Sequence, residues 1–91
     1  MTVVISPRAE RDFEAQVNWL RIHSPAAGRR AATCIIELID MLSDFPELGK
    51  LVQGGFREKH VQFGRDGFVV RYRVSATGIM VLRIFHSRQD R

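Results

Sequence analysis

Two segments in the first half of the chain have apolar residues at helical spacing, and each begins with a Ser-Pro pair. Ser6-Pro7 and Ser24-Pro25 place an N-cap side chain before a proline at the first helical position. The apolar positions are Ala9, Phe13, Val17 and Leu20 in the first segment, and Ala27, Ala31, Cys34, Ile35, Leu38, Ile39 and Leu42 in the second. We therefore expect helices over residues 7–23 and 25–44, joined as an antiparallel hairpin. The second helix should end before Pro46, because the residue preceding a proline resists the helical conformation.

The rest of the chain has the pattern of β-strands. Thr2–Ile5 is short and β-branched, and tight turns separate Phe56–Phe63, Phe68–Val74 and Ile79–His86. Residues 46–55 contain three glycines without periodicity, so we expect a loop there. The order β-α-α-β-β-β predicts a single α+β domain over residues 1–91. Its helix hairpin should cover one face of an antiparallel sheet, because otherwise neither apolar surface is buried.

Strand alternation assigns side chains to the two faces of this sheet. In the middle strand the residues expected to meet the helices are Phe68, Val70, Tyr72 and Val74. In the last strand they are Met80, Leu82 and Ile84, with Ile79, Val81, Arg83 and Phe85 on the opposite side. Arg71, Arg73 and Arg83 should then gather on one face. Arg57 and Lys59 fit either face, because the register of their strand is ambiguous.

The charges are unevenly distributed along the chain. Residues 1–56 hold six Lys/Arg and seven Asp/Glu, whereas residues 57–91 hold eight and three. This asymmetry indicates an anionic partner, either nucleic acid or an acidic protein. Guanidinium groups pair well with phosphate and carboxylate, although arginine is also common on a solvated sheet face. Arg83 favours the functional interpretation, because it interrupts an otherwise apolar strand.

Several classes of protein do not fit the sequence. A single cysteine, Cys34, excludes an internal disulfide, and its place in a helical apolar stripe indicates a core residue. His23, His60 and His86 lack metal-ligand spacing, and no phosphate-binding or dinucleotide motif is present, so we expect neither metal nor cofactor. Without an apolar run long enough to span a membrane, or a signal peptide, the expected location is the cytoplasm.

The basic residues on the strands are compatible with one reaction, the cleavage of RNA through its 2′-hydroxyl. It needs a base, an acid and cations around the phosphate, and arginine supplies only the cation. The nearby candidates for proton transfer are His86, His60, Glu58 and Lys59. A histidine at a strand end, such as His86, is more often a surface or capping residue.

Several motifs together resemble a known group of proteins. They are the two Ser-Pro helix starts, Gly55-Phe56-Arg57-Glu58, Val70-Arg71-Tyr72-Arg73-Val74 and the closing Arg83-Ile84-Phe85-His86-Ser87-Arg88-Gln89-Asp90. This pattern resembles the RelE/ParE superfamily of toxins from bacterial type II toxin-antitoxin systems. The ParE branch, which includes plasmid stabilisation proteins, is the closer match. The resemblance covers nearly the whole chain and implies the same β-α-α-β-β-β fold.

The resemblance also implies partners. A cognate ParD-like antitoxin would wrap the toxin in a hetero-oligomer and neutralise it. ParE-like members are associated with inhibition of DNA gyrase, whereas RelE-like members cut messenger RNA in the ribosomal A site. Arg83 matches the family's arginine on the last strand. The C-terminal tyrosine of many RelE-like nucleases has no match, since Gln89, Asp90 and Arg91 close the chain.

We therefore expect a toxin that inhibits gyrase by binding it. The residues expected to bind this target are Arg71, Arg73, Arg83 and Arg88. An mRNA endonuclease with Arg71, Arg83 and His86 around the phosphate is one alternative, and a non-toxic antitoxin-binding module is another. The antitoxin should lay an amphipathic helix on the exposed side of the helix hairpin and an extended part near the sheet edge. The residues expected to contact it are Trp19, Leu20, Ile22 and Leu48.

Overall fold

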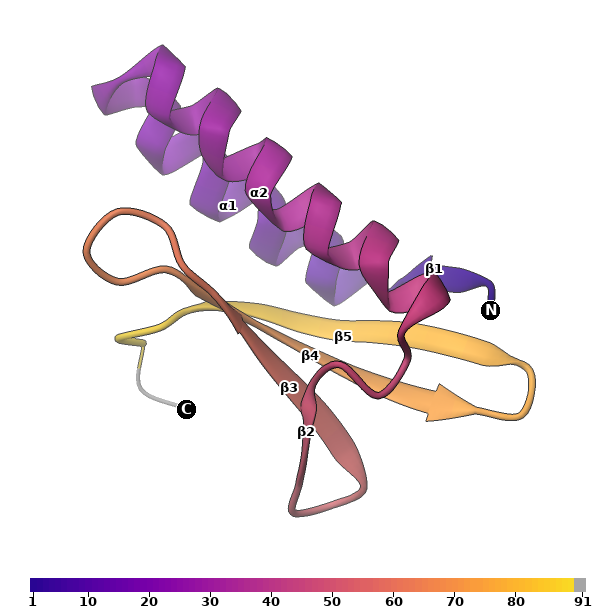
Figure 1. The fold of residues 1–91 in the computed structure, drawn as a ribbon. Helices are drawn as coiled ribbons and strands as arrows, with labels where there is room; N and C mark the ends of the chain where they lie inside the picture. The colour runs from indigo at the N-terminus through magenta and orange to yellow at the C-terminus, as the bar shows by residue number, and fades with distance from the viewer. Residues whose placement is uncertain (90–91) are drawn as a thin grey trace.

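Two helices lie along one face of a five-stranded sheet (Figure 1). The computed structural model describes residues 1–89. The elements are β1 (Val3–Ile5), α1 (Pro7–His23), α2 (Pro25–Asp44), β2 (Lys50–Val52), β3 (Phe56–Val61), β4 (Phe68–Ser75) and β5 (Gly78–His86). Both helices have the expected bounds, and the predicted α+β architecture is confirmed. Within the described residues no helix covers the other face of the sheet.

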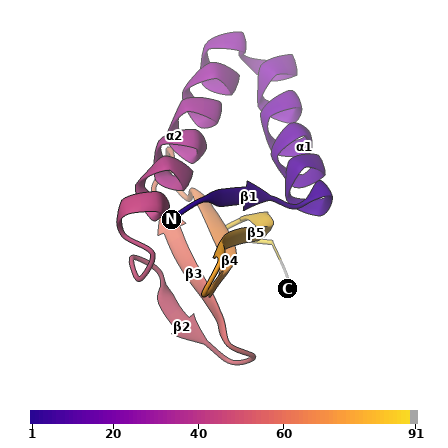
Figure 2. The ribbon, with the colours of Figure 1, turned by 90° about the vertical axis from the view of Figure 1, so that its right-hand side faces the viewer.

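The two helices begin as their Ser-Pro pairs predict. The Ser6 hydroxyl accepts a hydrogen bond from Ala9 N at 3.1 Å, and the Ser24 hydroxyl accepts one from Ala27 N at 3.2 Å. Ser24 also ends α1, because its N–H donates to Leu20 O at 2.7 Å. One residue therefore closes the hairpin. The helices diverge from this point, and β1 lies between their far ends (Figure 2).

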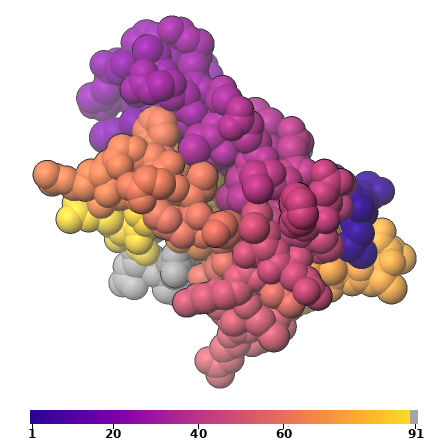
Figure 3. Space-filling model, in the orientation of Figure 1, coloured from indigo at the N-terminus to yellow at the C-terminus, as the bar shows by residue number. Residues whose placement is uncertain are grey.

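The sheet order is β1-β5-β4-β3-β2, with β1 parallel to β5 and the other pairs antiparallel. The sheet is therefore mixed, and the expectation of a wholly antiparallel sheet is wrong, because β1 pairs in parallel with β5. The expected loop over residues 46–55 also contains β2, which pairs with the start of β3. Three residues are too few to show an alternating pattern. Gly54 and Gly55, at φ angles of 94° and 81°, form the turn of the β2–β3 hairpin that projects from the body in Figure 3.

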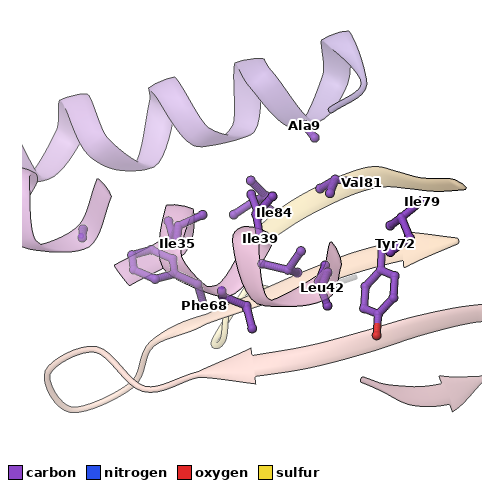
Figure 4. Close-up of a cluster of buried hydrophobic side chains, with 12 residues drawn as sticks. Ala9, Ile35, Ile39, Leu42, Phe68, Tyr72, Ile79, Val81 and Ile84 are labelled. Carbon is purple, nitrogen blue, oxygen red and sulfur yellow. The ribbon is translucent and has the colours of Figure 1, made fainter. Parts of the chain in front are cut away.

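The core lies between the helices and the near face of the sheet (Figure 4). As predicted, Phe68, Val70 and Tyr72 face the helices, where they are at most 2% exposed. The Tyr72 hydroxyl donates to Pro46 O at 2.8 Å and accepts from Gly49 N at 2.7 Å. Tyr72 thereby holds the connection between α2 and β2 against the sheet.

The predicted faces of β5 are wrong in its first half. Ile79 and Val81 are buried in the core, whereas Met80 is 39% exposed on the opposite face. A register shift explains this, because Arg71 pairs with Arg83 while the next residue, Tyr72, pairs with Val81. Leu82 is the extra residue of a β-bulge, and it reverses the alternation. Beyond the bulge, Ile84 faces the helices, and Arg83 and Phe85 face away, as predicted.

Candidate functional site

Three arginines alternate with two phenylalanines across the sheet face that lies opposite the helices. We call this set the arginine row; in order it consists of Arg73, Phe56, Arg71, Phe85 and Arg83. The guanidinium carbons of Arg73 and Arg83 lie 4.6 Å from the ring centroids of Phe56 and Phe85, respectively. Arg71 lies between both rings, at 5.7 and 5.0 Å. At these distances the rings attract the cations and hold the guanidinium groups in place.

Arg71 is paired with a carboxylate within the row. Its Nη2 and Nε lie 2.7 and 2.9 Å from Glu58 Oε2, and the two residues are cross-strand partners. This pairing places Glu58 on the face of the arginine row and its neighbours Arg57 and Lys59 on the helix side. Arg57 there donates from Nη1 to Gly49 O at 2.8 Å. Strand β3 thus adds the acidic residue Glu58 to the face of the arginine row. Its two basic residues, Arg57 and Lys59, lie on the other face.

Arg83 is held by Asp12 of α1. The Arg83 Nε–Asp12 Oδ2 distance is 2.8 Å, and the same oxygen accepts from Ile84 N at 2.9 Å. Strand β1 ends at Ile5, which leaves the edge of β5 without a neighbouring strand from Leu82 onward. The Ser6 hydroxyl donates to Leu82 O at 3.2 Å. Ser6 and Asp12 therefore satisfy the backbone where β1 stops, and Asp12 fixes Arg83 at the same time.

The environment of Asp12 favours its charged form. Partial burial acts to raise the pKa of Asp12, but the hydrogen bonds from Arg83 and Ile84 N and the charges of Arg83 and Arg8 outweigh it. The resulting pKa is lower than that of an ordinary aspartate. Asp12 is therefore a carboxylate at neutral pH and neutralises the Arg83 guanidinium.

Arg73 differs from the other two arginines of the row. Its side chain is exposed, and among residues 1–89 no carboxylate lies within 4 Å of its guanidinium nitrogens. Arg83 and Arg71 keep only 25% and 28% of their side-chain area exposed. The structure thus leaves Arg73 as the guanidinium of the row that is available to an incoming anion.

His86 does not join the arginines. It pairs with Phe68 across β4 and β5, and its ring packs edge-on against Phe68 at 6.1 Å between centroids. This places His86 on the helix side of the sheet, where its Nδ1 accepts from Arg88 N at 3.2 Å. The Arg88 side chain extends toward Asp66, with Nε 3.6 Å from Oδ1. Asp90 and Arg91, the end of the closing motif, lie outside the described residues.

Comparison with known proteins identifies the family. A family model described as "ParE toxin of type II toxin-antitoxin system, parDE" matches residues 3–91. The chain belongs to this family. Two relatives from Caulobacter vibrioides, Toxin RelE1 and Toxin RelE3, are each 34% identical over 90 residues. These matches cover 99% of this chain and 97% and 98% of the relatives.

A solved structure has the same fold. A chain titled "Chromosomal ParDE TA system from P. aeruginosa" matches with a TM-score of 0.79 over 97% of both chains, at 22% identity. The resemblance to the RelE/ParE superfamily is thus confirmed. This ParE-family chain is the toxin of a type II toxin-antitoxin system, and its partner is an antitoxin.

The four residues expected to bind the antitoxin lie at two ends of the toxin. Trp19 and Ile22, near the closed end of the hairpin, are 62% and 82% exposed, and Trp19 stacks on His23 with centroids 4.4 Å apart. Leu20 and Leu48 are partly buried and pack against the core. Leu48 follows α2, whose 20 residues span about 30 Å. The structure therefore does not gather these residues into one patch.

The toxin also has an apolar groove that the sequence analysis missed. We call it the hairpin groove; it lies at the open end of the helices and has a volume of about 250 Å³. Its lining residues are Ile5, Glu10, Phe13, Glu14, Ile36, Ile39 and Ile84. Ile36 is 49% exposed and Ile5 37%. Ile36 follows Ile35 of the buried stripe of α2, and this additional isoleucine is the sequence signal that could have revealed the hairpin groove.

Neither a metal centre nor a membrane span is found in the part of the toxin that the structure describes. Over residues 1–89 no three His, Cys, Asp or Glu side chains are grouped as metal ligands would be. No helix in this range is both long enough and apolar enough to cross a membrane.

Proposed function

We propose that this toxin inhibits DNA gyrase by binding it, without chemical turnover, and that a ParD-like antitoxin neutralises it. The arginine row is the proposed target surface, with Arg71, Arg73 and Arg83 in it. Arg88, whose side chain extends toward Asp66, is a further proposed target contact. The observation that carries the proposal is the separation of His86 from these arginines, on the other side of the sheet. The matching family model is described as ParE, the branch that the sequence resemblance associates with gyrase inhibition.

The geometry of the row suits binding better than RNA cleavage. General acid-base catalysis needs a proton acceptor within hydrogen-bond reach of the attacking hydroxyl, roughly 2.6–3.2 Å, and cations free to hold the phosphate. Here Glu58 and Asp12 already neutralise Arg71 and Arg83. The guanidinium groups are also fixed by the stacked rings. Such a rigid surface loses little side-chain freedom when a protein covers it.

The alternative is a ribosome-dependent mRNA endonuclease. The names of the two Caulobacter relatives, Toxin RelE1 and Toxin RelE3, favour it. On this hypothesis Arg71 and Arg83 would hold the phosphate, and His86 would have to act from across the sheet. His60 is better placed, because it pairs with Val69 and so shares the face of the arginine row. A non-toxic binding module is the remaining hypothesis.

Three measurements separate these functions. The purified toxin should inhibit supercoiling of relaxed plasmid by gyrase, and expression in cells should induce the DNA-damage response. Mapping of RNA ends from the same cells should show no new cleavage within codons. Codon-periodic cleavage with unaffected supercoiling would instead establish the nuclease, and normal growth with neither effect would establish the binding module.

The hairpin groove is the proposed docking site for an amphipathic segment of the antitoxin. Its floor is apolar, and Glu10 and Glu14 lie one helical turn apart on its α1 side. The segment should therefore insert an aliphatic side chain between the helices and place Lys or Arg beside these carboxylates. Trp19 and Ile22 remain proposed contacts nearer the closed end of the hairpin. Leu20 and Leu48 remain proposed contacts through their exposed edges.

A further inference from the structure

A second hollow lies on the opposite side of strand β1 from the hairpin groove. It has a volume of about 160 Å³. Its lining includes residues of the turn between β4 and β5, and Figure 1 shows where this turn lies in the sheet. Arg73 contributes to its lining together with hydroxyl and apolar side chains, namely Thr2, Val4, Ser75, Thr77 and Met80. We call this site the Arg73 hollow. It combines a cation, hydroxyl groups and apolar walls within one small concavity.

Arg73 is prepared for an anion by its neighbours in the arginine row. Phe56 holds its guanidinium at 4.6 Å from the ring centroid, so the group is positioned before any ligand arrives. Among the described residues no carboxylate neutralises it. The Arg73 hollow contains no acidic residue in its lining. Charge complementarity therefore calls for a negatively charged occupant.

We infer that the Arg73 hollow binds an aspartate or glutamate side chain of the antitoxin. This inference rests on the proposed function, since it assigns a second contact to the partner of the hairpin groove. A carboxylate can accept two parallel hydrogen bonds from one guanidinium. Val4 and Met80, which are 50% and 39% exposed, give an apolar neighbour of that acid a surface to cover.

An acidic protein segment fits this surface better than a nucleic acid. Binding to a nucleic-acid backbone relies on several cations that neutralise successive phosphates. In the arginine row, Glu58 and Asp12 neutralise two of the three guanidinium groups. One free arginine provides a single strong contact, which is what recognition of one carboxylate requires.

The position of β1 explains why one partner can reach both sites. Val4 and Ile5 are consecutive residues whose register partners are Met80 on the outer face and Val81 in the core. Val4 therefore lines the Arg73 hollow, while Ile5 lines the hairpin groove. Because β1 is an edge strand, a short segment that crosses it passes from one site to the other. The antitoxin segment should then carry basic residues near the groove and an acid beyond β1.

The test measures the affinity of the toxin for its full-length cognate antitoxin, by calorimetry at moderate salt. Arg73→Glu should weaken binding at least about tenfold, because the reversed charge repels the acid. Arg73→Lys keeps the positive charge but cannot form both parallel hydrogen bonds, so it should weaken binding less than Arg73→Glu does. Arg65→Glu is the matched control, since Arg65 is also exposed but lies in the β3–β4 turn, and it should bind like the wild type.

A second variant separates this inference from the proposed function. Ile36→Asp places a charge in the hairpin groove, so it should weaken antitoxin binding whether or not Arg73 takes part. If Ile36→Asp weakens antitoxin binding and Arg73→Glu does not, the inference is overturned, and the hairpin groove remains the docking site. Unchanged affinity in both variants would refute both sites. Loss of gyrase inhibition by Arg73→Glu with intact antitoxin binding would leave Arg73 as a contact to the target alone, and would also overturn the inference.

Discussion

Asp12 of α1 and Arg83 of β5 are 71 residues apart in sequence and form a hydrogen-bonded ion pair, with Arg83 Nε 2.8 Å from Asp12 Oδ2. The same carboxylate oxygen accepts the backbone N–H of Ile84. One acidic side chain therefore does two things. It satisfies the edge of β5 where β1 ends, and it ties the helix hairpin to the face of the sheet that carries the arginine row.

Asp12→Ala should destabilise the toxin. The substitution leaves the partly buried guanidinium of Arg83 and the N–H of Ile84 without their acceptor. Losing hydrogen bonds that involve a charged group costs about 1.5–3 kcal/mol. Urea unfolding followed by circular dichroism measures this change. Glu10→Ala, an exposed acid on the same helix, is the control and should change the free energy of unfolding by less than about 0.5 kcal/mol. Equal losses in the two variants would contradict the role of Asp12.

The lowered pKa of Asp12 predicts how stability depends on pH. Because the folded-state pKa lies below the unfolded value of about 3.9, the unfolded chain binds the proton more tightly. The stabilisation from Asp12 is therefore fully present above the unfolded pKa and is lost as the pH falls through the folded pKa. Asp12→Asn removes this titration. Its free energy of unfolding should decline less than that of the wild type in acid, as measured by urea unfolding between pH 6 and pH 2. Parallel pH curves would show that Asp12 titrates alike in both states.

Local signals in the sequence were sufficient to predict the two helices and the buried face of β4. Ser6 and Ser24 cap the two helices through short-range hydrogen bonds that a sequence pattern can reveal. In β4, polar residues alternate with apolar ones, so the buried face of Val70 and Tyr72 was predictable. These features depend on residues close to one another in the chain.

The features that the sequence did not predict depend on pairing between segments that are distant in the chain. Residues 79–82 are all apolar, so they carry no alternation, and the bulge at Leu82 arises only from pairing with Arg71 and Tyr72. Strand β2 is short and forms through its partner β3. The site was therefore predictable as a set of arginines on one face, but not their carboxylate partners or the hairpin groove.

Tyr72→Phe tests the connection between α2 and β2. The Tyr72 hydroxyl is the hydrogen-bond partner of both Pro46 O and Gly49 N, and the residue is fully buried. Removing it leaves a buried donor and a partly buried acceptor unsatisfied, so stability should fall by about 1–3 kcal/mol. Thermal and urea unfolding measure the loss. A change below about 0.5 kcal/mol would mean that water replaces the hydroxyl without cost.

His60→Gln and His86→Gln should leave toxicity unchanged if the toxin acts by binding. Glutamine retains a hydrogen-bond acceptor, which for His86 preserves the contact to Arg88 N, but it cannot transfer a proton at neutral pH. Loss of a general acid or base in a nuclease would lower the rate of cleavage by about 10²–10⁴-fold. Growth after induction, with soluble yield and antitoxin binding as controls for folding, distinguishes the two mechanisms. If His60→Gln abolished toxicity while antitoxin binding stayed intact, the catalytic alternative would be favoured, because His60 shares the face of Arg71 and Arg83. If His86→Gln alone abolished it, the helix side of the sheet would carry the site, and the arginine row would no longer be the target surface.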